Sequence, residues 1–236
     1  QKRMLEENLN DEHELQSYFI KRIEKYLNSR GKTLIGWDEI LEGGLAKNAV
    51  VQSWRGMNGG IEAAKHGNKV IMSPTSHAYF DYSIKSTDMK QVYHFDPIPT
   101  ELDSIQKQLV LGGECNLWSE HIPNEKKLDE MVFPRMLAMS EVLWSYPKER
   151  NYNDFLARAD NHAHLLRSYG VNVGLDAFPC QISTFKDTSN RAKISIHPGR
   201  KDLQFKYQWG MDSSMSPMDS SLNMPINRSG LLKIQA

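Results

Sequence analysis

Four short apolar runs, each separated from the next by a helical or turn-forming segment, constrain the fold of this 236-residue chain most strongly. They are continuously apolar rather than alternating, which is typical of strands buried on both faces. Strands of this kind that alternate with helices predict an α/β fold with a parallel sheet. The runs lie at residues 32–40, 49–54, 69–73 and 108–118, and we expect the third to continue beyond Pro74 into an extended segment at 78–82.

Helical periodicity is clearest at residues 11–30, where apolar side chains recur at steps of three and four. Asp11 suits the N-cap of this helix, and Gly31 suits a left-handed position after its last turn. A longer loop containing Pro97 and Pro99 precedes the fourth strand. We expect further helices at 61–67, 125–144 and 152–169, with Pro134 bending or dividing the second, and a short helical or turn segment at 41–48.

Composition excludes several classes of protein. Lysine plus arginine and aspartate plus glutamate both number 29, so the formal net charge is zero and a nucleic-acid partner is not expected. No apolar run approaches the roughly 20 residues of a membrane span. Cys115 and Cys180 cannot build a disulfide framework, and the eight histidines show no metal-binding spacing, so we expect no metal and no cofactor.

The number of strands limits the architecture. A (β/α)8 barrel needs about 250 residues and eight strands, whereas only four strands precede a change of character near residue 176. We therefore predict that residues 1–176 form the C-terminal half of a (β/α)8 TIM barrel and that residues 177–236 begin a β-sandwich-like module. An open, doubly wound four-stranded sheet is the alternative for the first region.

The carboxyl ends of the four runs carry aromatic and acidic side chains. In barrels, active sites lie at these ends. A single tryptophan there usually serves packing, but three at the same rim favour a ligand, because indole rings stack on sugars and carboxylates bind sugar hydroxyls. The residues are Trp37, Trp54, Tyr79, Asp81, Trp118 and Glu120.

Other candidates have structural interpretations. If Tyr79 and Asp81 lie in one strand, both point to the same face. Asp38 and Glu39 look like a catalytic pair, but adjacent strand residues point in opposite directions, so we expect one of them to be a structural ion-pair partner. We interpret Trp144 and Trp209 as structural as well.

The sequence resembles the β-N-acetylhexosaminidases of glycoside hydrolase family 20 along nearly its whole length. The resemblance is carried by ELQSYFIKRIEKYLNSRGKTLIGWDEILEGGL, VVQSWRG, GGIEAAKHG, IMSPTSHAYFDY, NLWSEHI and FPRMLAMSEVLWS. It implies an exo-acting enzyme that removes terminal N-acetylglucosamine or N-acetylgalactosamine. It also implies substrate-assisted retaining hydrolysis, in which the acetamido oxygen of the sugar is the nucleophile.

The resemblance also implies roles for individual residues. Trp37, Trp54 and Trp118 match the tryptophans that wall the acetamido pocket. Tyr79 matches the catalytic tyrosine whose hydroxyl donates a hydrogen bond to the acetamido oxygen. The two acids, Asp81 and Glu120, match those that bind the outer hydroxyls of the sugar.

One part of the family's machinery is not found. The general acid of the family is a glutamate directly after an aspartate at the end of the fourth barrel strand, which here would precede Gln1. Neither Asp11-Glu12 nor Asp38-Glu39 corresponds to it, so we expect this isolated chain to be inactive. Alternatives are a non-catalytic carbohydrate-binding fragment and an inert folding fragment. The family implies glycan substrates, the missing half barrel as a partner and a periplasmic or secreted location.

Overall fold

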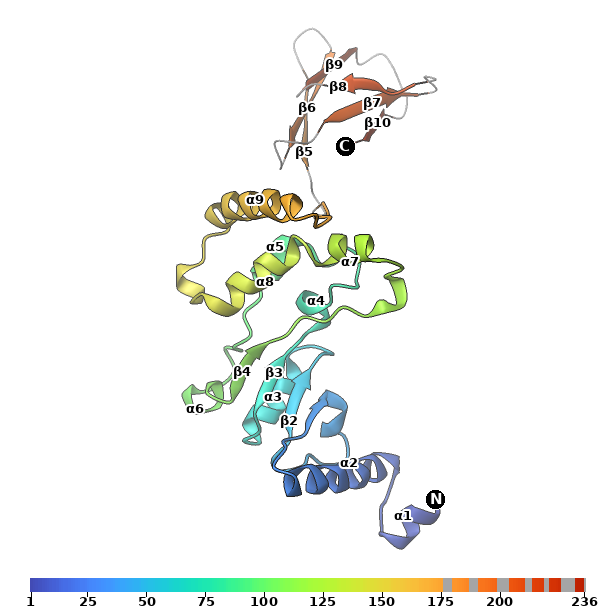
Figure 1. Cartoon of the computed structure of the whole chain (residues 1–236), viewed down its shortest axis with the longest axis vertical. Helices are drawn as coiled ribbons and strands as arrows, with labels where there is room; N and C mark the ends of the chain where they lie inside the picture. The colour runs from blue at the N-terminus through green and yellow to red at the C-terminus, as the bar shows by residue number, and fades with distance from the viewer. Residues whose placement is uncertain are drawn as a thin grey trace. The chain divides into compact units, whose positions relative to one another are not determined.

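A computed structural model of the chain describes residues 1–175, 180–186, 191–198, 204–210, 214–218, 221–225 and 232–235. The chain divides into two compact units, Gln1–Gly174 and Leu175–Ala236. The first unit contains a four-stranded parallel sheet in the order β1-β2-β3-β4 (Figure 1). Its strands are β1 (Ile35–Trp37), β2 (Val50–Ser53), β3 (Val70–Met72) and β4 (Val110–Gly113). The predicted α/β class with a parallel sheet is confirmed.

Several helices of the first unit begin at a residue whose side chain caps the first turn. The Asp11 side chain accepts a hydrogen bond from the backbone N–H of Glu14, and Gly31 has φ of 67°, as predicted for the two ends of α2. The helices are α1 (Lys2–Glu6), α2 (Glu12–Ser29), α3 (Asn58–Lys65), α4 (Thr75–Ala78), α5 (Met89–Tyr93), α6 (Ser104–Lys107), α7 (Glu125–Val132), α8 (Arg135–Trp144) and α9 (Tyr152–Ser168), with 3-10 turns η1 (Asp38–Leu41), η2 (Ser119–His121) and η3 (Pro147–Glu149).

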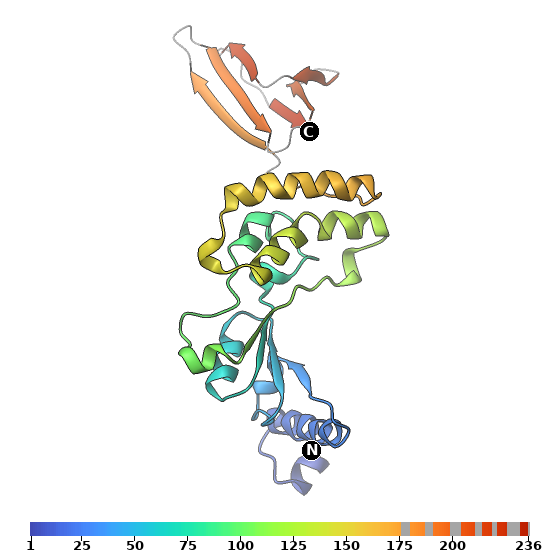
Figure 2. The ribbon, with the colours of Figure 1, turned by 60° about the vertical axis from the view of Figure 1, so that its left-hand side comes forward.

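The core of the first unit lies between the sheet and its helices. Helix α3 packs on β2 and β3, while α5, α8 and α9 form a neighbouring helical layer (Figure 2). Strand β2 is buried along its whole length, as predicted. The outer strands differ from the prediction, because Ile35 in β1 and Leu111 in β4 remain more than half exposed at the edges of the sheet.

Local predictions had mixed outcomes. The segment 41–48, predicted as helical or turn, contains turns at Glu42-Gly43 and Lys47-Asn48 and no α-helix, and η1 begins directly after β1. Two other predictions were wrong. Residues 78–82 do not form a strand, because Pro74 precedes the helical turn α4 and only Tyr79 makes a bridge, to Asn116. The loop before β4 contains α5 and α6, whose N-caps are Asp88 and Asp103. Pro134 does divide the predicted helix at 125–144, into α7 and α8.

The second unit is built from antiparallel strands in its described residues. They form two three-stranded sheets, in the orders β5-β6-β9 and β10-β7-β8. Ile196 in β6 and Phe205 in β7 are buried. The strands are β5 (Cys180–Lys186), β6 (Arg191–Pro198), β7 (Phe205–Trp209), β8 (Ser216–Met218), β9 (Ser221–Pro225) and β10 (Leu232–Gln235).

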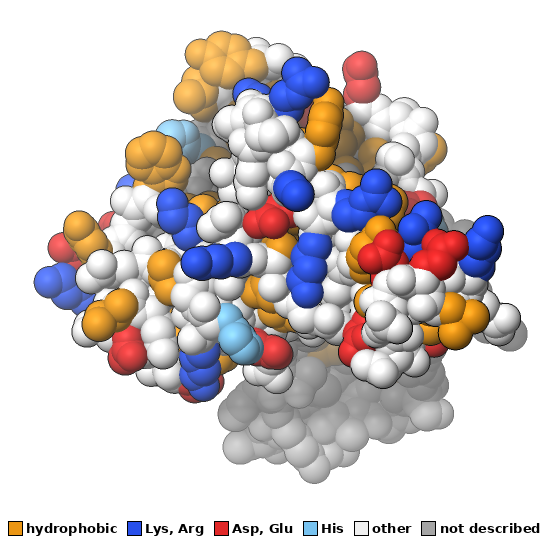
Figure 3. All heavy atoms as spheres, turned by 90° about the horizontal axis from the view of Figure 1, so that it is seen from below, with side chains coloured by type: hydrophobic (Ala, Val, Ile, Leu, Met, Phe, Trp, Pro, Cys, Tyr) orange, Lys and Arg blue, Asp and Glu red, His pale blue; other side chains and the backbone are white. Residues whose placement is uncertain are grey.

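Surface properties follow the balanced composition. The face shown in Figure 3 carries acidic and basic side chains interspersed with hydrophobic ones. Within the described residues, no helix combines the length and hydrophobicity that a membrane crossing needs. Trp144, which we interpreted as structural, lies at the end of α8 with 91% of its surface exposed, so it does not contribute to the core.

Candidate active site

Aromatic residues at or beyond the carboxyl ends of the four strands gather in one cluster. Trp37 is the last residue of β1, Trp54 directly follows β2, and Trp118 precedes η2 beyond β4. Tyr79 follows α4 and pairs through a backbone bridge with Asn116. We call Trp37, Trp54, Tyr79 and Trp118 the aromatic cluster.

Two ring pairs make up the aromatic cluster. The ring centroids of Trp37 and Trp118 lie 6.1 Å apart, as do those of Trp54 and Tyr79. In a flat sheet, β1 and β4 would be separated by about 14 Å, since neighbouring strands are about 4.8 Å apart. Trp37 and Trp118 therefore meet because side chains from the two edge strands converge over the strand ends.

Tyr79 is the buried centre of the cluster, with 5% of its surface exposed. Burial raises the pKa of its hydroxyl to about 12, against a smaller opposing effect of a hydrogen bond with the Trp118 side chain. The hydrogen bond links the two ring pairs. The raised pKa keeps the phenol protonated, and able to donate a hydrogen bond, well into the alkaline range.

The two predicted sugar-binding acids lie near the cluster in different environments. Asp81 is in the turn after Tyr79, and its Oδ1 is buried without a hydrogen-bond partner in the described part of the chain. A buried carboxylate oxygen without a partner is unfavourable, and this oxygen can accept a hydrogen bond only where a ligand or a movement of the turn brings a donor to it. Glu120 lies exposed in η2, two residues beyond Trp118. The prediction that Tyr79 and Asp81 share one face of a strand was wrong, because this segment turns after Tyr79.

Arg135 is a residue that sequence reasoning missed. It is 1% exposed, and its guanidinium donates hydrogen bonds to the backbone oxygens of Phe80, Tyr82 and Thr87. It also lies over the Phe80 ring, with its Cζ 4.7 Å from the ring centroid. Arg135 therefore fixes the loop that carries Tyr79 and Asp81. The only signal in the sequence was one arginine at the start of a mainly apolar helix.

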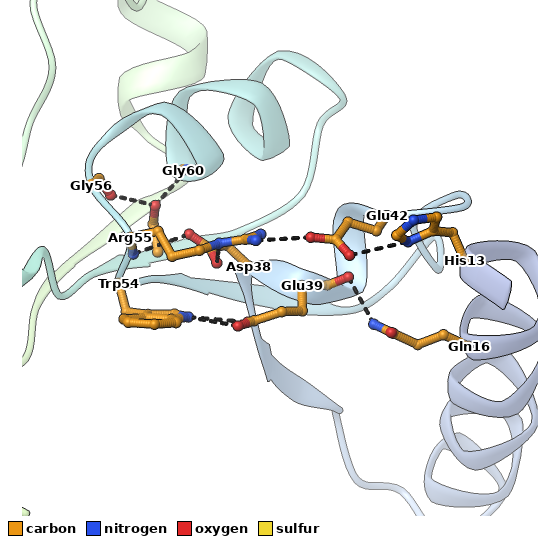
Figure 4. A network of polar contacts seen from close by, with 10 residues as sticks. His13, Gln16, Asp38, Glu39, Glu42, Trp54, Arg55, Gly56 and Gly60 are labelled. Carbon is orange, nitrogen blue, oxygen red and sulfur yellow. Dashed lines mark hydrogen bonds and ion pairs between the residues drawn. The ribbon is translucent and has the colours of Figure 1, made fainter.

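The adjacent acids Asp38 and Glu39 have separate structural partners. Asp38 is buried and accepts a hydrogen bond from Arg55 Nε at 2.7 Å, so one member of the pair is an ion-pair partner, as predicted. Glu39 accepts the indole N–H of Trp54 (Figure 4). The reasoning from strand geometry was wrong, because both residues lie in η1.

A cavity of about 540 Å³ lies beside this pair, between η1 and the beginning of α3. Asp38, Glu42 and Arg55 contribute to its wall, whereas the six predicted site residues do not. Groups of His, Cys, Asp and Glu side chains with the geometry of a metal site do not occur among the described residues.

The comparisons with known proteins agree on one family. The sequence model of the glycosyl hydrolase family 20 catalytic domain matches residues 1–147, which is more than half of the chain. The chain belongs to glycosyl hydrolase family 20. A β-hexosaminidase of Porphyromonas gingivalis is 38% identical over 252 residues, and the match covers 100% of this chain and 32% of that protein.

Solved structures of the family are similar in fold to most of this chain. An exo β-N-acetylglucosaminidase from Vibrio harveyi in complex with N-acetylglucosamine is 28% identical, with a TM-score of 0.66 over 72% of this chain and 29% of that one. A chitobiase from Flavobacterium johnsoniae is 32% identical, with a TM-score of 0.62 over 72% of this chain and 26% of that one. The chain thus spans about a third of the length of the relatives that it matches.

Proposed function

We propose that the chain is part of an exo-acting β-N-acetylhexosaminidase that removes terminal N-acetylglucosamine or N-acetylgalactosamine. The observation that carries the proposal is the aromatic cluster, in which side chains at or beyond the ends of four parallel strands converge around the buried Tyr79. Indole rings offer apolar faces to an N-acetyl methyl group and exclude water from it. The phenol offers a hydrogen-bond donor to the carbonyl oxygen of the same group.

The proposed mechanism uses the substrate's own acetamido group. Its carbonyl oxygen attacks the anomeric carbon as the glycosidic bond breaks, and an oxazolinium intermediate forms that water then opens with net retention. The Tyr79 hydroxyl orients that oxygen toward the anomeric carbon. Trp37, Trp54 and Trp118 enclose the group while charge develops on it. Asp81 and Glu120 bind the outer hydroxyls of the sugar through charge-assisted hydrogen bonds.

The general acid and its aspartate partner are proposed to lie upstream, in the half of a (β/α)8 barrel that precedes Gln1. On this proposal the four-stranded sheet completes its barrel with that half. The second unit is proposed to be part of a β-sandwich, and its two antiparallel sheets support this. The isolated chain would then bind the sugar without hydrolysing it. A periplasmic or secreted location is proposed from the resemblance alone.

Hydrolysis of chromogenic glycosides tests the proposal. A polypeptide that carries the upstream barrel strands should cleave 4-nitrophenyl N-acetyl-β-glucosaminide and should leave 4-nitrophenyl β-glucoside, which lacks the acetamido group, essentially intact. Residues 1–236 alone should cleave neither substrate. Equal cleavage of both substrates by the longer polypeptide would contradict the proposal. Cleavage by residues 1–236 would contradict the placement of the acid.

The alternative of a carbohydrate-binding fragment predicts a different result. A binding protein would hold N-acetylglucosamine in a calorimetric titration, yet the polypeptide with the upstream strands would show no turnover of either glycoside. The two outcomes separate the alternatives without any mutation.

A further inference from the structure

The carboxylates of two adjacent residues in η1 accept hydrogen bonds from two adjacent residues that follow β2 (Figure 4). β1 and β2 are parallel neighbours with Trp37 opposite Gln52, so the turn after β1 lies beside the segment after β2. Asp38 contacts Arg55, and Glu39 contacts Trp54. The pairing is therefore a direct consequence of the register of the two strands.

Asp38 is fully engaged by this arrangement. One oxygen accepts the Arg55 side chain at 2.7 Å, and the other lies 3.3 Å from the backbone nitrogen of the same residue. The Arg55 guanidinium also donates a hydrogen bond to the Glu42 carboxylate at 2.8 Å, and this bond lowers the pKa of Glu42. His13 Nδ1 lies 3.2 Å from the same carboxylate. The two Asp38 contacts anchor the backbone immediately after Trp54.

Glu39 contacts the Trp54 side chain itself. The indole Nε1 lies 3.1 and 3.0 Å from the two carboxylate oxygens, so a single N–H is shared between them. The backbone oxygen of Glu39 accepts a hydrogen bond from the Gln16 side chain of α2 at 3.0 Å. Glu39 is therefore held by α2 on one side and holds the Trp54 ring on the other.

We propose that Glu39 is a positioning residue whose carboxylate fixes the orientation of the Trp54 ring beside Tyr79. An indole has one polar atom, so a charge-assisted hydrogen bond at Nε1 restricts rotation of the ring about its side-chain bonds. The ring then presents its apolar face to the space next to the Tyr79 hydroxyl. The proposal rests on the proposed function, since it gives Glu39 a role in the acetamido pocket without contact with the substrate.

The geometry also separates Glu39 from a general acid. A general acid must reach the glycosidic oxygen with a proton, whereas both oxygens of Glu39 accept from an indole. Replacement by glutamine distinguishes the two roles. An amide oxygen still accepts the indole N–H, but an amide cannot donate a proton as a carboxylic acid does.

Kinetics of Glu39→Gln and Glu39→Leu test the proposal in the polypeptide that carries the upstream barrel strands. Glu39→Leu should lower kcat for 4-nitrophenyl N-acetyl-β-glucosaminide by about tenfold or more, because the ring is no longer held. Glu39→Gln should restore kcat to within about threefold, with the wild-type pH profile. Glu42→Gln is the matched control, since Glu42 contacts Arg55 but not Trp54, and it should keep wild-type kcat.

Two kinetic outcomes would overturn the proposal. Wild-type kcat in Glu39→Leu would show that the ring needs no carboxylate. Loss of activity in Glu39→Gln as severe as in Glu39→Leu, with the alkaline limb of the pH profile removed, would make Glu39 a proton donor.

A nuclear magnetic resonance measurement is independent of turnover. The chain has five tryptophans, so ¹⁵N-labelling of tryptophan gives a small set of indole signals, and Trp54→Phe assigns one of them. The Trp54 signal should move strongly in Glu39→Leu, less in Glu39→Gln and not in Glu42→Gln. An unmoved signal in a folded Glu39→Leu would refute the contact. Absence of wild-type turnover together with a moved signal would instead refute the proposed function and leave the contact intact.

Discussion

Tyr79 and Trp118 belong to the same aromatic cluster, yet Tyr79 is 5% exposed and Trp118 is 44% exposed. Tyr79 lies between a backbone bridge to Asn116 and a loop fixed by buried Arg135. Trp118 precedes an exposed 3-10 turn and touches the cluster mainly through Trp37 and Tyr79. One half of the site is therefore built into the core of this chain, and the other half lies on its surface.

This difference separates two uses of aromatic residues in one site. A buried side chain contributes to folding as well as to ligand contact, so its substitution affects both stability and activity. An exposed side chain contributes little to folding, so its substitution reports ligand contact almost alone. Stability and activity measured on the same variants can therefore test the comparison.

The largest expected effect is a loss of stability from a substitution in the buried half of the site. Arg135→Met should lower the free energy of unfolding by about 3–5 kcal/mol, because four backbone oxygens lose the hydrogen bonds that Arg135 donates to them. Arg3→Met is the control, since Arg3 pairs with Glu6 and Glu7 at the surface and an exposed pair contributes at most about 1 kcal/mol. Urea denaturation followed by circular dichroism measures both values. Similar losses in the two variants would contradict the role of Arg135.

Tyr79→Phe should lower kcat by about 100- to 1000-fold, a loss typical of removing one donor that stabilises a transition state. Its effect on the affinity for N-acetylglucosamine should be much smaller, because the bond strengthens as the acetamido oxygen attacks. Steady-state kinetics and calorimetric titration measure the two quantities. A variant with wild-type kcat would refute the role of the hydroxyl.

Trp118→Ala should separate ligand contact from stability. We expect Trp118→Ala to lower the free energy of unfolding by less than Trp54→Ala does, because 44% of the Trp118 surface is exposed, while kcat/KM falls by about tenfold because one wall of the pocket is lost. Trp54→Ala, from the more enclosed part of the cluster, should lower both quantities. The comparison fails if Trp118→Ala destabilises the protein as much as Trp54→Ala does.

The smallest expected effect is the change in the free energy of unfolding at alkaline pH. Burial raises the pKa of Tyr79 and of Tyr93 to about 12. Each phenol therefore stabilises the folded state fully below its ordinary pKa of about 10, and this contribution is lost as the pH rises from about 10 toward 12. The free energy of unfolding should fall between pH 9 and 11, and should fall less in Tyr79→Phe than in wild type.

A surface tyrosine is the control for that pH series. Tyr146 is exposed, and Tyr146→Phe should lose as much stability between pH 9 and 11 as wild type does. Identical pH dependence in Tyr79→Phe and wild type would contradict the burial of Tyr79.

Much of the fold could be predicted from the sequence, because local hydrophobic patterns and capping residues agree with it. The strands, α2 with its Asp11 cap, and the break at Pro134 all follow from short stretches of sequence. The short helices α5 and α6 were missed, although Asp103 and Gln106 form a capping box. Each is only one turn long, too short for an apolar periodicity to be recognised.

Less of the candidate site than of the fold could be predicted from the sequence. The aromatic residues at the strand ends were visible, because parallel strands bring those positions to one edge. The contact of Glu39 with Trp54 and the anchoring of the Tyr79 loop by Arg135 depend on strand register and on packing between distant segments. No local pattern encodes contacts of that kind.

Substrates with a weakened acetamido nucleophile test the central claim most directly. Replacing the methyl hydrogens of the N-acetyl group by one, two and three fluorines withdraws electrons from the carbonyl oxygen with little change in shape. If that oxygen is the nucleophile, kcat/KM of the polypeptide with the upstream strands should fall steeply with each fluorine. Rates that stay level across the series would contradict substrate-assisted hydrolysis at the aromatic cluster.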